Sequence, residues 1–173
     1  MSWDAIEVPS LASGPGSFLA TGKECWQGTA SQANLKDTGS SWSEALRRRV
    51  LIVDDDAGTG RLLALLVRHH GHHADYVDSG FKALDYLSDQ PADLVILDVM
   101  MPGLDGLEVL KRVRTDPKTA GVPVVMFSAL CDPKYTEQAR EIGANDYWVK
   151  ASLDFQTLGN RLAVFLPSSQ QAD

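Results

Sequence analysis

The chain has 173 residues, of which 44% are hydrophobic and 23% charged, and its formal net charge is −7 at pH 7. This is the composition of a globular protein with room for one domain and an extra segment. The acidic balance argues against the basic stripe of nucleic-acid-binding proteins, so we expect no nucleic-acid partner. No apolar run approaches the length of a membrane-spanning helix, and the acidic N-terminus does not resemble a secretory signal, so we expect no membrane association. Two cysteines, Cys25 and Cys131, indicate no disulfide framework and suit the cytoplasm.

Residues 1–46 are rich in Ser, Gly, Ala and Thr and show little hydrophobic periodicity. Such a segment buries too little apolar surface to offset its conformational entropy, so we predict a mostly disordered tail. Its tryptophans, Trp3, Trp26 and Trp42, are either chance hydrophobics or docking points on this domain or on a partner. The basic triplet 47–49 stands directly ahead of an apolar run, and we interpret it as a solvated lead-in to a strand.

Between residues 47 and 166, short apolar runs alternate with helical patterns. The expected strands are 50–53, 72–77, 94–97, 122–127 and 146–149. The helical stripes are Leu62, Leu65, Leu66 and His69; Ala83, Leu84 and Leu87; Leu107, Leu110 and Val113; and Phe155, Leu158, Leu162 and Phe165. Another helix is expected to begin at Pro133 and end at Gly143. This alternation predicts an α/β fold with a doubly wound, five-stranded parallel sheet, followed by a C-terminal tail at 167–173.

Polar residues stand where these strands end: Asp54 and Asp55, then Asp98, Ser128 and Lys150. A doubly wound sheet places its site outside the carboxyl ends of its strands, so we expect these side chains to converge. Clustered carboxylates repel one another and need a cation, and an all-oxygen set suits Mg²⁺. An aspartate beside Mg²⁺, a lysine and a hydroxyl is fitted to attack phosphorus.

Four segments resemble the receiver family of two-component response regulators, including its chemotaxis regulators. They are Val50–Asp55, Leu94–Gly106, Val125–Ala129 and Gly143–Lys150, in the order the family requires. The resemblance covers about residues 47–166. It implies a flavodoxin-like (βα)5 fold with strand order 2-1-3-4-5, and a phosphoryl group accepted in a Mg²⁺-dependent reaction from a histidine kinase or a phosphotransfer protein.

The same resemblance assigns roles to individual residues. Asp98 is the implied phosphoacceptor. The implied metal ligands are Asp54, Asp55, Asp98 and the backbone carbonyl of Met100. Ser128, Ala129 and Lys150 are the implied phosphoryl contacts, and Ser128 and Tyr147 the implied switch pair. Only about seven residues follow Leu166, so we expect output through an unknown partner protein, through the tail, or through a homodimer formed by the fourth helix, fifth strand and fifth helix.

The chain departs from the family pattern near this site. Ala151 follows Lys150 where the family usually has proline, and a cis bond before alanine costs about 3 kcal/mol, so we expect a different loop there. Gly58 and Gly60 stand in the first turn of the first helix, where each glycine weakens a helix by about 1 kcal/mol. We therefore expect a looser helix start at this end of the site.

Two alternative functions remain. The first is a receiver-shaped interaction module that is never phosphorylated. The second is a phosphatase of the haloacid-dehalogenase type, suggested by the triplet Asp54-Asp55-Asp56, but that family needs an acidic pair after the lysine, and only Asp154 and Asp173 follow Lys150. A metal site formed by His69, His70, His72 and His73 is disfavoured, because these residues straddle a helix end and a strand start and point several ways.

The two positions that tune attack by water in the family are Met100 and Leu130 here. Apolar side chains cannot orient a water molecule, so we predict a long-lived phosphoryl state. The decay of radiolabelled phosphoryl protein in the absence of a donor measures it, and loss of the label within seconds would contradict the prediction.

Overall fold

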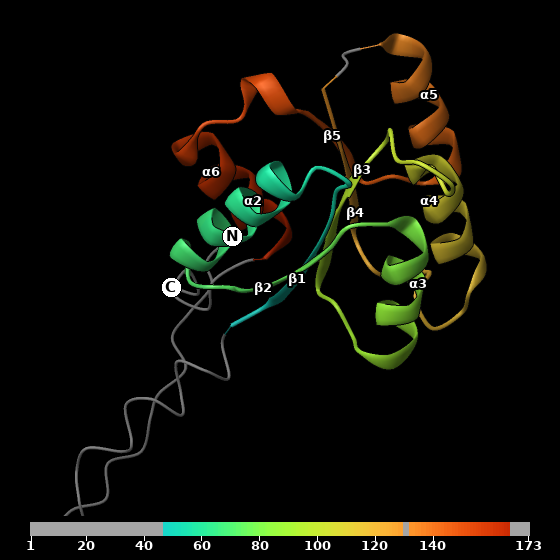
Figure 1. Ribbon diagram of the computed structural model, residues 1–173, viewed down its shortest axis with the longest axis horizontal. Coiled ribbons are helices and arrows are strands. Elements are labelled where there is room, and N and C mark those ends of the chain that lie inside the picture. The colour runs from blue at the N-terminus through green and yellow to red at the C-terminus, as the bar shows by residue number, and fades with distance from the viewer. Residues whose placement is uncertain (1–46, 130–131, 167–173) are drawn as a thin grey trace, which may run out of the picture. The chain divides into compact units, whose positions relative to one another are not determined.

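The computed structural model describes residues 47–129 and 132–166. The predicted tails at 1–46 and 167–173, with the three tryptophans, and Leu130 lie outside the described residues. Five strands form one parallel sheet in the order β2-β1-β3-β4-β5 (Figure 1). Their bounds are β1 Arg49–Val53, β2 His73–Val77, β3 Leu94–Asp98, β4 Val124–Ser128 and β5 Asp146–Val149. The predicted fold class and strand order are confirmed.

The helices are α2 Ala57–His69, α3 Gly80–Asp89, α4 Gly106–Thr115, α5 Pro133–Ile142 and α6 Phe155–Phe165, with a 3₁₀ turn, η1, at Lys150–Ser152. Each α-helix begins after a side chain that accepts a backbone N–H of its first turn, namely Asp56, Ser79, Asp105, Asp132 or Asp154. The helix predicted between Pro133 and Gly143 is confirmed, and Gly143 ends it with φ of 111°. Within the described ranges, no helix combines the length and the apolarity that crossing a membrane requires.

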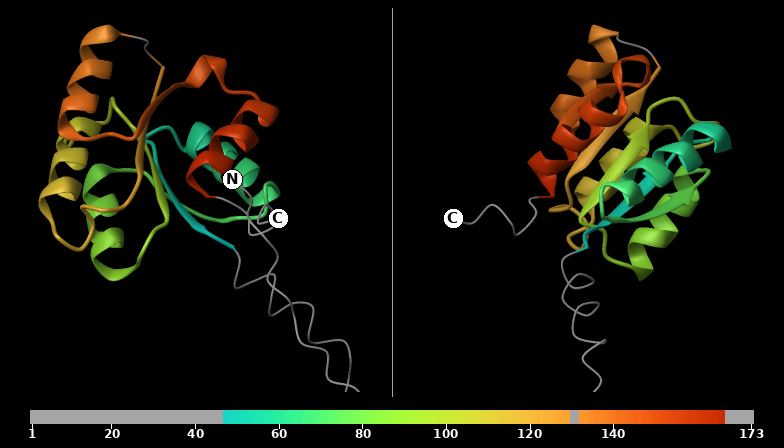
Figure 2. Two further views of the ribbon diagram at one scale, coloured as in Figure 1. Left: turned by 180° about the vertical axis from the view of Figure 1, so that it is seen from behind. Right: turned by 90° about the vertical axis from the view of Figure 1, so that its left-hand side faces the viewer.

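The helices lie in two layers, with α2 and α6 on one face of the sheet and α3, α4 and α5 on the other (Figures 1 and 2). Side chains alternate between the two faces along each strand. In β1, Val50 and Ile52 therefore pack under α2 and α6, whereas Leu51 and Val53 pack under α3, α4 and α5. The central strands are buried on both faces, which explains why they appear in the sequence as continuous apolar runs.

The packed face of the first helix overlaps the predicted stripe only in part: Leu66 is partly buried against the core, but two other leucines of the stripe are exposed. Leu62 is 57% exposed and Leu65 is 61% exposed, whereas Leu63, Ala64 and Val67 are buried. Apolar residues on this helix occupy two overlapping faces, so their spacing alone did not distinguish the packed face from the exposed one.

The start of α2 fits closely against a tyrosine of the edge strand β2. A Cβ atom on Gly60 would lie 2.1 Å from the ring of Tyr76. The Tyr76 hydroxyl donates a hydrogen bond of 3.0 Å to the backbone carbonyl of Asp54. Gly60, which we expected only to loosen the helix, is therefore the position that admits the tyrosine ring and lets it reach the end of β1.

We predict that Gly60→Ala destabilises the protein by about 1 to 3 kcal/mol, although alanine ordinarily favours a helix, because the new methyl group would overlap the ring of Tyr76. The free energy of unfolding in urea measures the effect. Gly58→Ala in the same turn is the matched control, because its Cβ would meet only the Asp56 side chain, at 3.2 Å. Tyr76→Ala should remove most of the penalty for alanine at position 60. Equal effects of the two alanine substitutions would contradict the steric explanation.

A second tyrosine joins α3 to β2. The Tyr86 hydroxyl donates a 2.5 Å hydrogen bond to Asp75. Burial, followed by the bond to this carboxylate, raises the pKa of Tyr86 to about 12. A tyrosine whose pKa is raised in the folded state stabilises the fold below its unfolded pKa of about 10, and this stabilisation is lost as the pH rises toward the folded value.

We therefore expect the free energy of unfolding to fall between about pH 10 and about pH 12, and to fall less steeply in Tyr86→Phe. Spectrophotometric titration at the phenolate absorption band should show a component near pH 12 that is absent from the variant. Tyr76, whose pKa is also raised by burial, should titrate alike in both proteins. Tyr86→Phe should also cost about 1 kcal/mol at neutral pH, because the Asp75 carboxylate loses its donor. Identical alkaline titrations of the two proteins would contradict this assignment.

Candidate functional site: a carboxylate cluster at the strand ends

The carboxyl ends of four neighbouring strands meet at one edge of the sheet. Asp54 follows β1, Asp98 ends β3, Ser128 ends β4 and Lys150 follows β5. Asp54, Asp98 and Ser128 are buried, and Asp55 is exposed. The structure thus brings together the residues that the strand pattern predicted to converge.

Lys150 lies between two of the carboxylates. Its Nζ is 2.7 Å from Asp54 Oδ2 and 3.0 Å from Asp98 Oδ2. It also lies 5.4 Å from the centre of the Phe127 ring, which offers the ammonium a favourable π face. The carboxylates of Asp54 and Asp98 would repel each other at this short range. The ammonium of Lys150 contacts both and offsets that repulsion.

Burial shapes the protonation of this group of side chains. It raises the pKa of Asp54, and Lys150 and the Asp56 N–H offset the rise only in part. Burial alone would lower the pKa of Lys150, but its contacts with Asp54 and Asp98 outweigh burial and raise it. The ammonium therefore keeps its proton, and the charged form of Asp54 is held at a free-energy cost that a second cation would reduce.

The acidic residues fit a hard divalent cation. One carboxylate oxygen from each of Asp54, Asp55 and Asp98 lies within 4.8 Å of the others. Asp54 Oδ2 is buried and meets Lys150 without hydrogen-bond geometry, so it keeps capacity for a metal ion or a water molecule. Mg²⁺ prefers oxygen ligands and retains several waters, so Asp54, Asp55 and Asp98 would be the residues that hold it, in part through water.

The loop after β3 holds the Asp98 carboxylate in place. The Met100 N–H donates to Asp98 Oδ1 at 3.3 Å, leaving Oδ2 toward Lys150. Gly106 returns the chain so tightly that a Cβ there would lie 2.0 Å from the backbone carbonyl oxygen of Asp98. Its N–H donates to the carbonyl of Val99 at 3.0 Å. A glycine at 106 is thus required by the close approach of α4 to the end of β3.

The other predicted site residues lie around this cluster. Ala129 is exposed just beyond β4. Tyr147 pairs with Met126 across β4 and β5 and packs, partly buried, against the core under α3, α4 and α5. The phosphoryl contacts of Ser128 and Ala129, the switch roles of Ser128 and Tyr147, and the metal contact of the Met100 carbonyl remain predictions.

With alanine at position 151, the chain continues from Lys150 directly into the η1 turn, and every described peptide bond is trans. The departure from the family's usual proline does not detach the lysine, because Lys150 contacts both Asp54 and Asp98.

One residue beside the cluster had no signal in the sequence. Tyr76 touches the backbone of Asp54 through its hydroxyl. It is the penultimate residue of β2 and belongs to the strand itself, whereas the other residues were recognised as polar residues that end or follow a strand. Only the close contact between Tyr76 and Gly60 of α2 could have indicated this role. That contact cannot be recognised until the fold is known.

Comparisons with known proteins agree with this geometry. MtrA of Mycobacterium tuberculosis, a DNA-binding response regulator, is 36% identical over 107 residues, which cover 62% of this chain and 46% of MtrA. The structure of a putative response regulator from Chloroflexus aurantiacus is 36% identical, with a TM-score of 0.66, and the match covers 69% of this chain and 98% of that one. The receiver domain of a sensor histidine kinase from Pseudomonas aeruginosa, 23% identical with a TM-score of 0.65, shares the fold over 70% of this chain and 99% of its own.

These relatives correct one prediction. We expected no nucleic-acid partner from the acidic charge, but the relatives include a DNA-binding response regulator. This chain spans slightly less than half the length of MtrA. The net charge of −7 describes this chain alone, so it could not exclude nucleic acid as a partner for a family whose members extend beyond the matched region.

The family model for the response regulator receiver domain matches residues 50–163, which is more than half of the chain. That range contains all four motifs and each of the strand-end residues described above. Receiver domains are parts of signalling proteins and are not classical enzymes. The chain belongs to the response regulator receiver domain family.

Proposed function

We propose that residues 47–166 form a phosphoacceptor domain, in which Asp98 accepts a phosphoryl group from a histidine kinase or a phosphotransfer protein. The observation that carries this proposal is the cluster itself: oxygens of Asp54, Asp55 and Asp98 within 4.8 Å of one another, with the Lys150 ammonium 3.0 Å from Asp98. Two buried acids and one exposed acid beside a single compensating lysine suit the transfer of a highly charged group.

Asp54, Asp55, Asp98 and the Met100 carbonyl would hold Mg²⁺. A magnesium ion is coordinated in the active-site cleft of the Pseudomonas receiver domain, and we propose the same ion here because of this chain's own carboxylates. When bound, it would neutralise charge on the carboxylates and on the phosphoryl oxygens.

In the proposed transfer, one carboxylate oxygen of Asp98 forms a bond to phosphorus as the bond between phosphorus and the donor's histidine nitrogen breaks. The nitrogen keeps the electron pair of that bond and takes up a proton. Lys150 is already within reach of Asp98 Oδ2, and it would follow the new charge by contacting a phosphoryl oxygen. Ser128 and the N–H of Ala129 would donate to other oxygens of the group.

The added charge, near −2 by analogy with other phosphoryl groups, would bias the position of Ser128 and Tyr147. These residues end β4 and stand within β5, so their movement would alter the face formed by α5, β5 and α6, which are the fourth helix, fifth strand and fifth helix. The domain would signal through this conformational change to a partner protein.

We expect incubation with acetyl phosphate and Mg²⁺ to add one phosphoryl group, detected by intact mass, and excess EDTA to abolish the gain. Asp98→Asn should lose it completely, because the neutral amide oxygen is a far weaker nucleophile than a carboxylate oxygen. Asp89→Asn, at the end of α3 and far from the cluster, is the matched control and should react as the wild type does.

Other outcomes would favour the alternatives. A gain that survives in Asp98→Asn but disappears in Asp54→Asn would favour the phosphatase chemistry. No gain in the wild type would favour the module that is not phosphorylated.

A further inference from the structure

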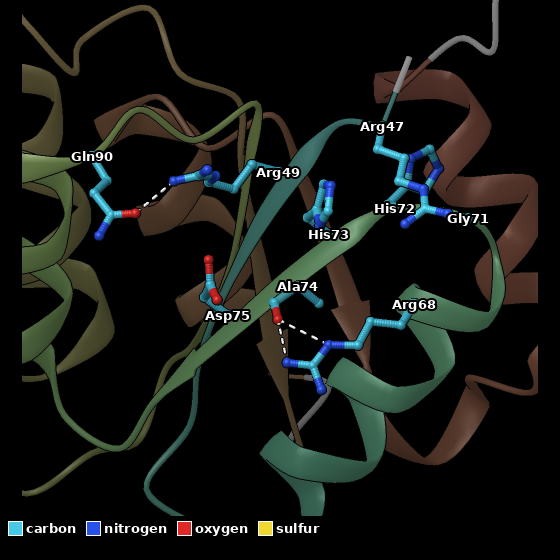
Figure 3. Close-up of a pocket in the computed structure, with 9 residues that line it drawn as sticks. All are labelled: Arg47, Arg49, Arg68, Gly71, His72, His73, Ala74, Asp75 and Gln90. Carbon is cyan, nitrogen blue, oxygen red and sulfur yellow. Dashed lines mark hydrogen bonds between the residues drawn. The ribbon is translucent and has the colours of Figure 1, made fainter. Parts of the chain in front are cut away.

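A second charged site lies at the opposite end of the strands from the carboxylate cluster. A cavity of about 500 Å³ opens across the starts of β1 and β2 (Figure 3). Three arginines line it: Arg47 and Arg49 at the start of β1, and Arg68 near the end of α2. The other lining residues are Gly71, His72, His73, Ala74, Asp75 and Gln90.

The three arginines have no carboxylate partner among the described residues. The neighbouring Arg48 does, because its guanidinium pairs with Asp93 at 3.5 Å. The second oxygen of Asp93 accepts the Arg49 backbone N–H at 2.7 Å, so both oxygens of this acid already have partners. The basic triplet 47–49 is therefore not uniform. Arg48 is neutralised by Asp93, whereas Arg47 and Arg49 line the cavity.

The cavity carries a net positive charge. Its lining has three arginines and one acid, so its formal charge is 3 − 1 = +2 with the histidines neutral. Burial lowers the pKa of His72, which supports counting it as neutral. A local excess of positive charge in a chain whose net charge is −7 would attract an anion.

Neutral groups hold two of the guanidiniums in position. Arg68 Nε donates to the carbonyl of Ala74 at 3.1 Å, and its Nη2 donates to the same oxygen. Arg49 Nη1 donates to Gln90 Oε1 at 2.5 Å. Figure 3 shows these two arginines on opposite sides of β2, each anchored by a dashed contact. Since a guanidinium has five N–H donors, each arginine keeps donors for a ligand, and neither anchor cancels its charge.

Size and chemistry together indicate the ligand. About 500 Å³ lies within the range of small-molecule sites. Guanidinium groups recognise phosphate through paired N–H donors. Three arginines without a carboxylate partner around one cavity suit an anion that carries more than one phosphate group.

We propose that this cavity binds a small anion carrying at least two linked phosphate groups, such as inorganic triphosphate or a nucleoside triphosphate. The site is separate from the carboxylate cluster, because the cavity lies at the amino ends of β1 and β2 and the cluster lies at carboxyl ends.

Isothermal titration of the full chain with inorganic triphosphate, in EDTA, tests the proposal. The chelator keeps Mg²⁺ from carrying the anion to the carboxylate cluster. We expect saturable binding that weakens about fivefold or more in Arg47→Gln and in Arg49→Gln, because each loses a charge-assisted contact. Arg112→Gln on α4, which pairs with the exposed Glu108, removes the same charge elsewhere and should change binding less than about twofold. Asp98→Asn should bind as the wild type does.

Three results would overturn the proposal: no saturable binding by the wild type, equal weakening by Arg112→Gln and Arg49→Gln, or loss of binding in Asp98→Asn. A nucleoside triphosphate and a short DNA duplex serve as further probes. Arginine-dependent binding of the duplex without binding of either triphosphate would also overturn it, and would assign the surface to a nucleic-acid backbone. Thermal melting of each variant confirms that loss of binding is not loss of folding, and the two arginine substitutions provide independent tests if one of them unfolds.

Discussion

The contact of one lysine with two buried carboxylates is the constraint around which the site is built. Asp54 and Asp98 follow or end neighbouring strands, and strand pairing brings both out of water at the same edge. Two charges in such a place are tolerated only if a cation stands between them. Lys150 comes from the far edge strand β5, so its ion pairs tie that strand's end to the middle of the sheet.

Much of this arrangement was predictable, because a strand buried on both faces appears as an apolar run and its polar terminus marks a position at the sheet edge. Asp54, Asp98, Ser128 and Lys150 could thus be placed together from the sequence alone. The face of a helix that packs against the sheet was harder to predict from the sequence. On α2, leucines occupy overlapping faces, and the stripe that looked regular proved partly exposed. The net charge was also a poor guide to local charge. Summed over the whole chain it is −7, although one cavity is lined by three arginines and one acid.

The two ends of the sheet have opposite electrostatic character. At the carboxyl ends, acids outnumber the one lysine, and the site favours a cation. At the amino ends of β1 and β2, arginines outnumber the one acid. The same strands therefore support both sites while keeping them apart. The helices cover the faces of the sheet and leave these two ends open, which is why residues that bear charge gather there.

The close fit of Gly60 against Tyr76 has an evolutionary consequence. Neither residue can change freely on its own: a side chain at 60 requires a smaller neighbour at 76, and a large ring at 76 requires glycine at 60. The two positions should therefore substitute in pairs during divergence. Once the ring is present at 76, α2 must keep glycine at 60, although helices ordinarily avoid glycine. Changing the two positions one at a time would give either an overpacked intermediate, with a side chain at 60 beside the ring, or a cavity, with a small residue at 76 beside Gly60.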